Sequence, residues 1–413
     1  MDSSADGLPG RVVVTGIGAV TAAGWGVPPL RAALQSGRTA IGPFDRFDNA
    51  RQRTHVAGQV PPGPPGAERR FVHWGRLSNS DRFALFSALE AAEQAGFRVP
   101  FDHGLAGVFF GSSTGGLYET EEYFEELLRR PERGPARALM ASHPLGAPAE
   151  TVARHLRLRG PVETFSSACA SGGLAVEQAL RALRAREVDV AFAGGADSLC
   201  LTTYSGFNAL RALDESPCRP FRADRAGLSL GEGGAVLVLE TLEHARDRGA
   251  RPLAEIVGAG SSCDATHMTA PHAEGLGAVL ALERALEDAG LQAGGIDAVN
   301  AHGTGTPLND AAEWAALSRV FGERARSLPM EAPKSVLGHL LGAAGAIEAV
   351  TAVLGLLDGE VHPTPGGGPV DPALPVDLAL NGPRPVPAMR NTVSVSLGFG
   401  GANSAVILGR WQG

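Results

Sequence analysis

Lysine is almost absent from this chain. Of its 413 residues, 36 are lysine or arginine, and a single one of these is a lysine, Lys334. An ammonium group is a compact point charge, whereas a guanidinium group is a broad planar fork. Because arginine is used at every other basic position, the lysine at 334 indicates a site too narrow for a guanidinium group. Chance survival of one lysine in an arginine-biased composition is the competing explanation.

Excess positive charge and abundant cysteine are missing as well. The net charge is −8, which excludes a typical nucleic-acid binder, because such proteins rely on clustered positive charge. Four cysteines are too few and too scattered for a disulfide framework or a metal site, so we expect no metal. They suit a reducing cytoplasm, and they are Cys169, Cys200, Cys218 and Cys263.

A leader and a membrane span are also not expected. The first six residues are acidic and polar, which does not fit a signal peptide. Residues 340–357 are apolar enough to resemble a membrane span, but Glu348 lies in their middle and small residues are frequent. A buried core helix is the better interpretation, so we predict a cytoplasmic protein that does not enter a membrane.

Strand and helix patterns alternate along the whole chain, which predicts an α/β fold with buried sheets. Short runs rich in β-branched and aromatic residues predict strands at residues 11–15, 107–110, 190–193, 235–239, 297–300 and 392–396. Helical periodicity appears at residues 80–95, 171–185, 275–289 and 343–357.

The pattern also hints at an internal duplication. The strand and turn at residues 13–18 are echoed at 255–260, and each half carries a helix rich in small residues, near Gly172 and near Gly342. We therefore predict two similar halves, residues 1–250 and residues 251–413, packed as layers back to back.

A glycine pair near the N-terminus invites a dinucleotide-binding interpretation that the surrounding residues do not support. Gly16 and Gly18 follow a predicted strand, but Thr21 occupies the third glycine position of that fingerprint, and no acidic residue stands at the expected later strand end. A tight turn is the simpler explanation.

Cys169 stands in an unusual setting. It lies within a run of small residues, 166–173, that leads into a predicted helix. A thiol there would feel the free N–H groups and the positive end of the helix dipole, so we expect a lowered pKa and a reactive thiolate. The same N–H groups can hold an oxyanion. A buried, inert cysteine is the alternative, and it is the interpretation given to Cys200.

Two histidines in the second half complete a candidate site. His302 follows a predicted strand and precedes a glycine-rich turn, and His339 follows Gly338 in the stretch that Lys334 opens. Lone histidines are usually core or surface residues. Two of them flanked by glycine, with a candidate nucleophile upstream, favour a catalytic constellation.

These residues give the chain a family resemblance. It resembles a β-ketoacyl-[acyl carrier protein] synthase of the elongating type over nearly its whole length. The resemblance implies the thiolase fold, a five-layered αβαβα arrangement of two similar halves, in which residues 1–250 carry the nucleophile and residues 251–413 carry both histidines. The motifs that carry it are the cysteine elbow at Cys169, the His-Gly-Thr-Gly-Thr turn at His302, the Lys-Ser-x-x-Gly-His stretch at Lys334, and Gly398-Phe399-Gly400-Gly401.

The resemblance implies a role for each catalytic position. Cys169 would take an acyl chain as a thioester, and His302 and His339, as neutral imidazoles, would support decarboxylation of a malonyl unit. Lys334 and Glu313 would form an ion pair that fixes the histidines. Phe399 would supply a backbone oxyanion donor, with Cys169, and act as a gate.

It also implies a set of substrate-binding positions. Thr304 and Thr306 would bind the phosphopantetheine arm, Thr114 and Phe207 would line the acyl tunnel, and Gly400 would lie beside the gate. The chain departs from the family pattern at Leu397 and Asn309, near the gate and the turn, which bears on substrate selection.

The implied partner is an acyl carrier protein, whose phosphopantetheine carries the substrates, so no separate cofactor is expected. Candidate docking residues are Arg69, Arg70, Arg76 and Arg82. Relatives pair as dimers, which predicts a homodimer or a heterodimer with a related subunit. The sequence does not choose between fatty acid, polyketide and polyene pathways.

Two alternatives stay open. A thiolase would use a second cysteine near the C-terminus, and residues 398–401 contain none. A non-catalytic subunit that sets chain length would lack the nucleophile, whereas Cys169 is present.

Overall fold

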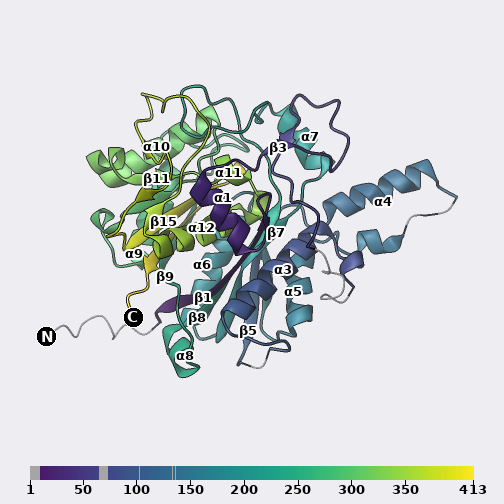
Figure 1. The fold of residues 1–413 in the computed structure, drawn as a ribbon, viewed down its shortest axis with the longest axis horizontal. Helices are drawn as coiled ribbons and strands as arrows, with labels where there is room; N and C mark the ends of the chain where they lie inside the picture. Colours follow the sequence, from purple (N-terminus) through teal and green to yellow (C-terminus); the bar gives the residue numbers. More distant parts are fainter. Residues whose placement is uncertain (1–9, 65–72, 102, 133, 135) are drawn as a thin grey trace.

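The computed structural model describes residues 10–64, 73–101, 103–132, 134 and 136–413. Arg69 and Arg70, two of the four predicted docking residues, lie outside these ranges. Figure 1 shows a broad twisted sheet with helices against both of its halves and an extended helical arm, α4, to one side.

The sheet consists of two halves with the same topology. The first half has the order β6-β5-β7-β8-β1 and the second has the order β11-β10-β15-β16-β9, with β13 at its outer edge. When these five strands of each half are numbered along the chain, their order across the sheet is third, second, fourth, fifth and first in both halves. The pairs β5–β6 and β5–β7 are parallel, like β10–β11 and β10–β15, and the edge pair β11–β13 is parallel as well. The pairs β7–β8 and β8–β1, like β15–β16 and β16–β9, are antiparallel. The predicted duplication is visible in this repeat.

The two halves join where β1 pairs with β9 in antiparallel register, with Val12 opposite Ile256. The strands of the first half are β1 (Val12–Thr21), β5 (Ala106–Gly111), β6 (Val162–Phe165), β7 (Val190–Asp197) and β8 (Gly233–Thr241). Those of the second are β9 (Ala254–Cys263), β10 (Ala298–Asn300), β11 (Pro329–Glu331), β13 (Asp377–Leu378), β15 (Asn391–Leu397) and β16 (Ala402–Arg410). Short additional strands are β2 (Gly24–Trp25), β3 (Gly42–Pro43), β4 (Val56–Ala57), β12 (Glu360–Val361) and β14 (Arg384–Pro385).

Helices form the other three layers. α3 (Asn79–Gln94) and α5 (Ala147–Leu156) pack on the first half of the sheet, and α9 (Leu276–Asp288), with α10 (Pro307–Phe321) beside it, packs on the second. α6 (Ser171–Arg184) and α12 (Ala344–Asp358) pack against each other and contact strands of both halves. The remaining α-helices among the described residues are α1 (Val27–Ser36), α4 (Leu117–Arg129), α7 (Leu201–Ala209), α8 (Leu242–Asp247) and α11 (Lys334–Leu337). The layers follow the predicted αβαβα order.

The central helices approach each other closely because their contacts are made by glycine. A Cβ added at Gly345 would lie 2.5 Å from the backbone nitrogen of Gly173, and one added at Gly172 would lie 2.6 Å from that of Ala346. The apolar stretch Leu341–Asp358 is 89% buried, so the segment that resembles a membrane span is a core helix, as predicted. This close packing brings the starts of both helices to the same place.

Most of the predicted strands and helices lie within one or two residues of their predicted ends, whereas β1 and β7 extend further. Several observed elements were not predicted, among them β6, β16, α5 and α10. The strong amphipathic helix α4 was not predicted, because its many glutamates (Leu-Tyr-Glu-Thr-Glu-Glu) obscure the apolar face. β1 continues to Thr21, beyond the predicted end at Thr15, because every residue along it is buried.

Candidate active site

Cys169 lies in a tight turn between β6 and α6. Ala168, the residue before it, has a left-handed backbone with φ of 48°, and α6 begins two residues after it, at Ser171. The hydroxyl of Ser171 donates to the carbonyl of Ala168 at 2.6 Å and accepts from the N–H of Ser167 at 2.8 Å, which holds the turn. The predicted position of Cys169 just ahead of a helix is confirmed.

The predicted acidity of this thiol is wrong. Burial raises the pKa of Cys169 to about 11, although the positive charge of Lys334 and the backbone N–H groups of Phe399 and Cys169 lower it in part. Removing the sulfur from water disfavours the thiolate more than these donors favour it. The resting group is therefore a thiol. The two N–H groups that reach the sulfur converge on one point, as an oxyanion hole requires.

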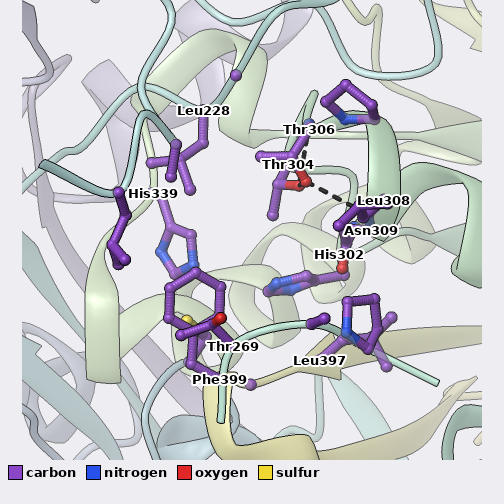
Figure 2. A pocket seen from close by; sticks show the side chains of 18 of the residues that line it. Leu228, Thr269, His302, Thr304, Thr306, Leu308, Asn309, His339, Leu397 and Phe399 are labelled. Atoms are coloured by element: carbon purple, nitrogen blue, oxygen red, sulfur yellow. Dashed lines mark hydrogen bonds between the residues drawn. The ribbon is translucent and has the colours of Figure 1, made fainter. Parts of the chain in front are cut away.

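His302 and His339 meet at this cysteine from two different segments. His302 follows β10, and His339 follows α11. Their ring centroids lie 5.5 Å apart at an interplanar angle of 87°, a T-shaped arrangement, and Figure 2 shows the two rings close together. The Cys169 sulfur and one ring nitrogen of each histidine all lie within 4.8 Å of one another. The structure thus brings together the three residues that the sequence singled out.

Hydrogen bonds fix the tautomer of both histidines. The Lys334 ammonium donates to His302 Nδ1 at 3.0 Å and to the His302 carbonyl at 2.6 Å, and the Leu341 N–H donates to His339 Nδ1 at 3.0 Å. Because each Nδ1 accepts a hydrogen bond, the proton of each neutral ring lies on Nε2. The Nε2 of His339 is buried and has no hydrogen-bond partner in the described part of the chain.

Both histidines are held neutral. Burial lowers the pKa of His302 and of His339 well below 6.5, and the charge of Lys334 lowers both further. A neutral imidazole with Nε2 protonated is a hydrogen-bond donor without a net charge. The site therefore presents two N–H donors next to a thiol.

The predicted ion pair between Lys334 and Glu313 is not formed. Lys334 instead pairs with Glu348 of α12, which also accepts from the Ser396 hydroxyl at 3.1 Å. Glu313 accepts from the backbone N–H groups of His302, at 2.6 Å, and Gly303, at 2.8 Å. The prediction failed because α10 places Glu313 behind the His302 turn, while the packing of α12 brings a carboxylate to the ammonium.

Burial raises the pKa of Glu313 to about 8, although its two backbone donors lower it in part. Its role in the structure is to hold the turn that presents His302. A carboxyl group that accepts two backbone N–H bonds fixes that turn as firmly as a capping residue fixes a helix.

A cavity of about 260 Å³ opens above the three residues. Thr304 and Thr306 line it, and their hydroxyls lie 2.9 Å apart. Phe207 lines it as well, with its ring stacked on that of Phe399 at a centroid distance of 5.5 Å. Both departures from the family pattern, Leu397 and Asn309, also lie in its wall, and Figure 2 shows several of these side chains around the cavity.

Two predicted substrate-binding residues do not line this cavity. Thr114 is buried, and its hydroxyl donates to Asp197 at 3.0 Å. Gly400 donates its N–H to the carbonyl of Met268 at 2.8 Å and has a left-handed backbone with φ of 84°. Contacts of Thr114 and Gly400 with an acyl chain stay predictions.

Two acidic residues that organise the site, Asp197 and Glu348, were not predicted from the sequence. Asp197 is fully buried and accepts from the N–H groups of Ser113, Thr114 and Gly342, which ties the end of β7 to the segment after His339. Glu348 had a visible signal, since it is the one charged residue inside an otherwise apolar helix that ends at Asp358. Asp197 had none, because its donors come from two segments far from it in the chain, residues 112–115 and Gly342.

Cys169, His302 and His339 also have the side-chain types of a metal site. One thiol and two imidazoles are ligands that Zn²⁺ favours. Two ring nitrogens already accept hydrogen bonds from Lys334 and Leu341, and the ammonium would repel a cation at short range. The arrangement fits acyl chemistry better.

The two predicted docking residues that the structure describes, Arg76 and Arg82, do not line the cavity at Cys169. Arg76 is exposed, whereas Arg82 donates to the carbonyl of Trp74 at 3.1 Å and lies 5.8 Å from the centre of its ring. Neither residue lines the cavity, so their contact with a partner stays a prediction.

Comparison with known proteins identifies the family and the fold. Residues 10–245 match the family described as Beta-ketoacyl synthase, N-terminal domain, and residues 253–367 match Beta-ketoacyl synthase, C-terminal domain. The chain belongs to the beta-ketoacyl synthase family. The family boundary falls close to residue 250, although the predicted division into domains stays a prediction.

Relatives match this synthase over almost its full length. It is 39% identical to a Streptomyces halstedii protein named as polyketide beta-ketoacyl synthase 1, covering 96% of this chain and 97% of that protein. It is 33% identical to 3-oxoacyl-[acyl-carrier-protein] synthase 2 of Staphylococcus aureus, covering 97% and 99%. A solved structure of the ishigamide ketosynthase/chain length factor matches with a TM-score of 0.93 and 34% identity, over 98% of this chain and 100% of that one.

Proposed function

We propose that this synthase condenses an acyl chain held on Cys169 with a malonyl unit carried by an acyl carrier protein, with loss of CO₂. The observation that carries the proposal is the convergence, within 4.8 Å, of the Cys169 sulfur with ring nitrogens of two neutral histidines. The name of the Staphylococcus aureus relative supports the carrier protein as substrate bearer.

Acyl loading would use Cys169 alone as nucleophile. Its sulfur attacks the thioester carbonyl of the incoming acyl group, the bond to the pantetheine sulfur breaks, and the thiol proton passes to that leaving sulfur. The N–H groups of Cys169 and Phe399 reach the Cys169 sulfur, so they are placed to stabilise the oxyanion of the tetrahedral intermediate.

Decarboxylation would use the two histidines. The malonyl thioester carbonyl accepts from Nε2–H of His302 and His339, and loss of CO₂ leaves an enolate on that oxygen. Neutral donors suit this step, because a hydrogen bond to a developing oxyanion strengthens as charge accumulates. Lys334 acts as a positioning residue, since its hydrogen bond to Nδ1 keeps the proton of His302 on Nε2.

Condensation would return the enzyme to its starting state. The enolate carbon attacks the acyl-Cys169 carbonyl, a carbon–carbon bond forms, and the thioester bond to sulfur breaks. The product is a 3-oxoacyl group on the carrier protein. The released thiolate takes a proton from water, as its raised pKa of about 11 requires at neutral pH.

A partner subunit is part of the proposal. One structural relative is a ketosynthase/chain length factor, and the edge strand β6 of this chain is open on one side among the described strands. We therefore propose a homodimer or a heterodimer in the cytoplasm. Cys169, His302 and His339 together favour the catalytic subunit over a non-catalytic one.

Intact-protein mass spectrometry tests this function. The purified chain is mixed with a panel of acyl carrier protein thioesters and then with malonyl carrier protein, alone and with a coexpressed partner subunit. We expect an acyl mass on the wild type, none on Cys169→Ala, and release as a 3-oxoacyl carrier protein after the malonyl addition. Absence of any acyl adduct, with and without the partner, would refute the catalytic assignment.

A further inference from the structure

A second cluster of ionisable groups lies at the far end of α12. One carboxylate oxygen of Asp358, one of Glu360 and one ring nitrogen of His362 all lie within 4.8 Å of one another. Asp358 ends α12, and the other two residues follow on and after β12. None of the three lines the cavity at Cys169.

The histidine of this cluster is oriented by a carboxylate. His362 Nδ1 lies 2.8 Å from Glu331 Oε2, and Glu331 in turn accepts from the Asn300 amide at 2.7 Å. A histidine that binds a metal usually donates its other ring N–H to a carboxylate, which fixes the tautomer and makes the free nitrogen a better ligand. Glu331 therefore leaves His362 Nε2 as the free donor atom.

Two atoms of the cluster have no hydrogen-bond partner in the described part of the chain. His362 is 1% exposed, and its Nε2 is buried and unpartnered. Glu360 Oε1 is buried and unpartnered as well. Buried polar atoms of this kind are rare and costly unless a ligand satisfies them.

A small space lies beside the cluster. It is a cavity of about 10 Å³, about the size of one water molecule, and its lining includes Glu331, Glu360 and Gly355 but neither Asp358 nor His362. A Cβ at Gly355 would lie 3.0 Å from the Glu360 carbonyl, so glycine keeps this space open.

The charges of the cluster do not cancel among the described residues. Asp358 accepts from Arg31 through both of its oxygens and from the Gln35 amide at 3.2 Å, so its charge is already balanced. His362 is the one basic side chain in the described part of the chain that forms an ion pair with Glu331 or Glu360. Arg384, on the strand next to β12, pairs with Asp377. A dication would neutralise the two remaining carboxylates.

We propose that Asp358, Glu360 and His362 bind a divalent metal ion of the Zn²⁺ class, with Glu331 orienting the histidine. Imidazole and carboxylate ligands suit Zn²⁺, whereas Mg²⁺ prefers oxygen ligands alone. Zn²⁺ bonds of about 2.0–2.2 Å require the three donor atoms to draw together by roughly an ångström. The ion would clamp α1, through Arg31 and Asp358, to the end of α12 and to β12.

A proton on His362 is the competing occupant. Burial by itself lowers the pKa of His362, but the carboxylates of Glu331, Glu360 and Asp358 raise it overall. Metal binding must displace that proton. Direct measurement of metal binding separates the two occupants.

Equilibrium dialysis with ⁶⁵Zn²⁺ on the full chain tests the site. A Cys169→Ala background removes the thiol ligand of the other donor set, and Glu360→Gln or Glu331→Gln is added to it. Glu323→Gln, a 95% exposed carboxylate in a short helix, is the matched control. Circular dichroism and the melting temperature without metal verify that each variant folds.

We expect one Zn²⁺ per chain in the Cys169→Ala background and in its Glu323→Gln variant. Glu360→Gln should weaken binding at least 10-fold, and Glu331→Gln about 10- to 100-fold. Zn²⁺, but not Mg²⁺, should raise the melting temperature of the background and of the control, with a smaller rise in the Glu360→Gln variant. No retained Zn²⁺ in the background, or equal affinity with and without Glu360, would overturn the proposal.

Discussion

At the scale of single residues, the site depends on which atom of each histidine carries the proton. Lys334 and the Leu341 N–H each donate to an Nδ1, which leaves both Nε2–H groups for the substrate. A compact ammonium can reach His302 Nδ1, the His302 carbonyl and Glu348 from one buried position. This geometry explains why the chain keeps a lysine here and arginine elsewhere.

Replacing Lys334 by arginine tests that explanation. Lys334 is buried, and the planar guanidinium cannot make the same three contacts in its place. For Lys334→Arg we expect CO₂ release from malonyl carrier protein to fall by roughly 100-fold, as when a stabilising donor is lost. The rate of Cys169 acylation, measured by mass spectrometry, should change only a few-fold.

Arg324→Lys is the matched control, because Arg324 donates to the carbonyls of Ala293 and Ile296 outside the cavity. It should leave both steps unchanged. Equal loss of acylation and decarboxylation in Lys334→Arg would contradict a specific role at the histidine.

Glu313 provides a second test at this scale, through pH. Its pKa is raised from 4.5 to about 8. Between these two pH values, Glu313 is therefore protonated in the folded chain and ionised in the unfolded chain. The stabilisation is full below pH 4.5 and is lost as pH rises through about 8. Glu313→Gln removes the ionisable group but keeps only one of the two acceptors, so its urea midpoint should be lower than that of wild type at pH 6. The difference between the two midpoints should shift in favour of the variant at pH 9, where the wild-type carboxylate is charged.

Glu313→Ala should behave differently, because it leaves the N–H groups of His302 and Gly303 without their acceptor. We expect at least a 10-fold loss of condensation, and a smaller loss for Glu313→Gln, which keeps one of the two acceptors. An unchanged pH dependence of the urea midpoint in Glu313→Gln would show that Glu313 is ionised in the folded chain.

At the scale of elements, α6 and α12 set the geometry of the site. α6 carries the turn of Cys169 at its start, and α12 brings Glu348 to Lys334. Their contact is made through Gly172, Gly173 and Gly345, where any side chain would meet backbone atoms or neighbouring side chains. The distance between the nucleophile and the buried ion pair is thus fixed by backbone packing.

Gly345→Ala should disturb this contact. Its Cβ would lie 2.5 Å from the Gly173 nitrogen, so the two helices must separate. We expect a loss of about 1–3 kcal/mol in the free energy of unfolding, as for an overpacked core, together with a larger loss of condensation than in variants of equal stability. Urea unfolding and product formation measure both effects.

Gly206→Ala in α7 is the control, since a Cβ there meets nothing within 4 Å. Alanine in a helix interior should then stabilise the chain by roughly 0.5–1 kcal/mol. If Gly345→Ala is as stable and active as Gly206→Ala, the central helices are not held by this contact.

At the scale of the whole molecule, the open edge and exposed apolar side chains indicate a partner surface. β6 is the outer strand of the first half, and Val162 on it is 41% exposed. In α4, the arm in Figure 1, Phe124 is 50% and Leu128 is 82% exposed. Natural proteins usually pair or cover such edges and patches.

Val162→Lys should therefore weaken the proposed dimer. A charged side chain on an edge strand opposes edge-to-edge pairing, so sedimentation equilibrium should shift from a dimer toward the 42.5 kDa monomer. Val162→Thr, which keeps the β-branched shape, should remain dimeric. A Val162→Lys variant with the wild-type dimer affinity would place the interface elsewhere.

The sequence by itself determined the parts of this protein that depend on local chemistry. The helices at residues 171–185 and 343–357, the buried strands and the repeat of the two halves follow from apolar periodicity and small residues, and most of their ends were predicted to within one or two residues. The turns at Cys169, His302 and His339 were also found, because glycine and other small residues mark such turns directly.

Only the tertiary structure decided how those pieces act on one another. Lys334 pairs with Glu348 and not Glu313, because helix packing selects the carboxylate that reaches the ammonium. The Cys169 pKa rises because burial outweighs the neighbouring charge and backbone donors. Asp197 and the cluster at His362 join segments far apart in the chain. Burial and partner choice are properties of the packed molecule, so no local pattern contains them.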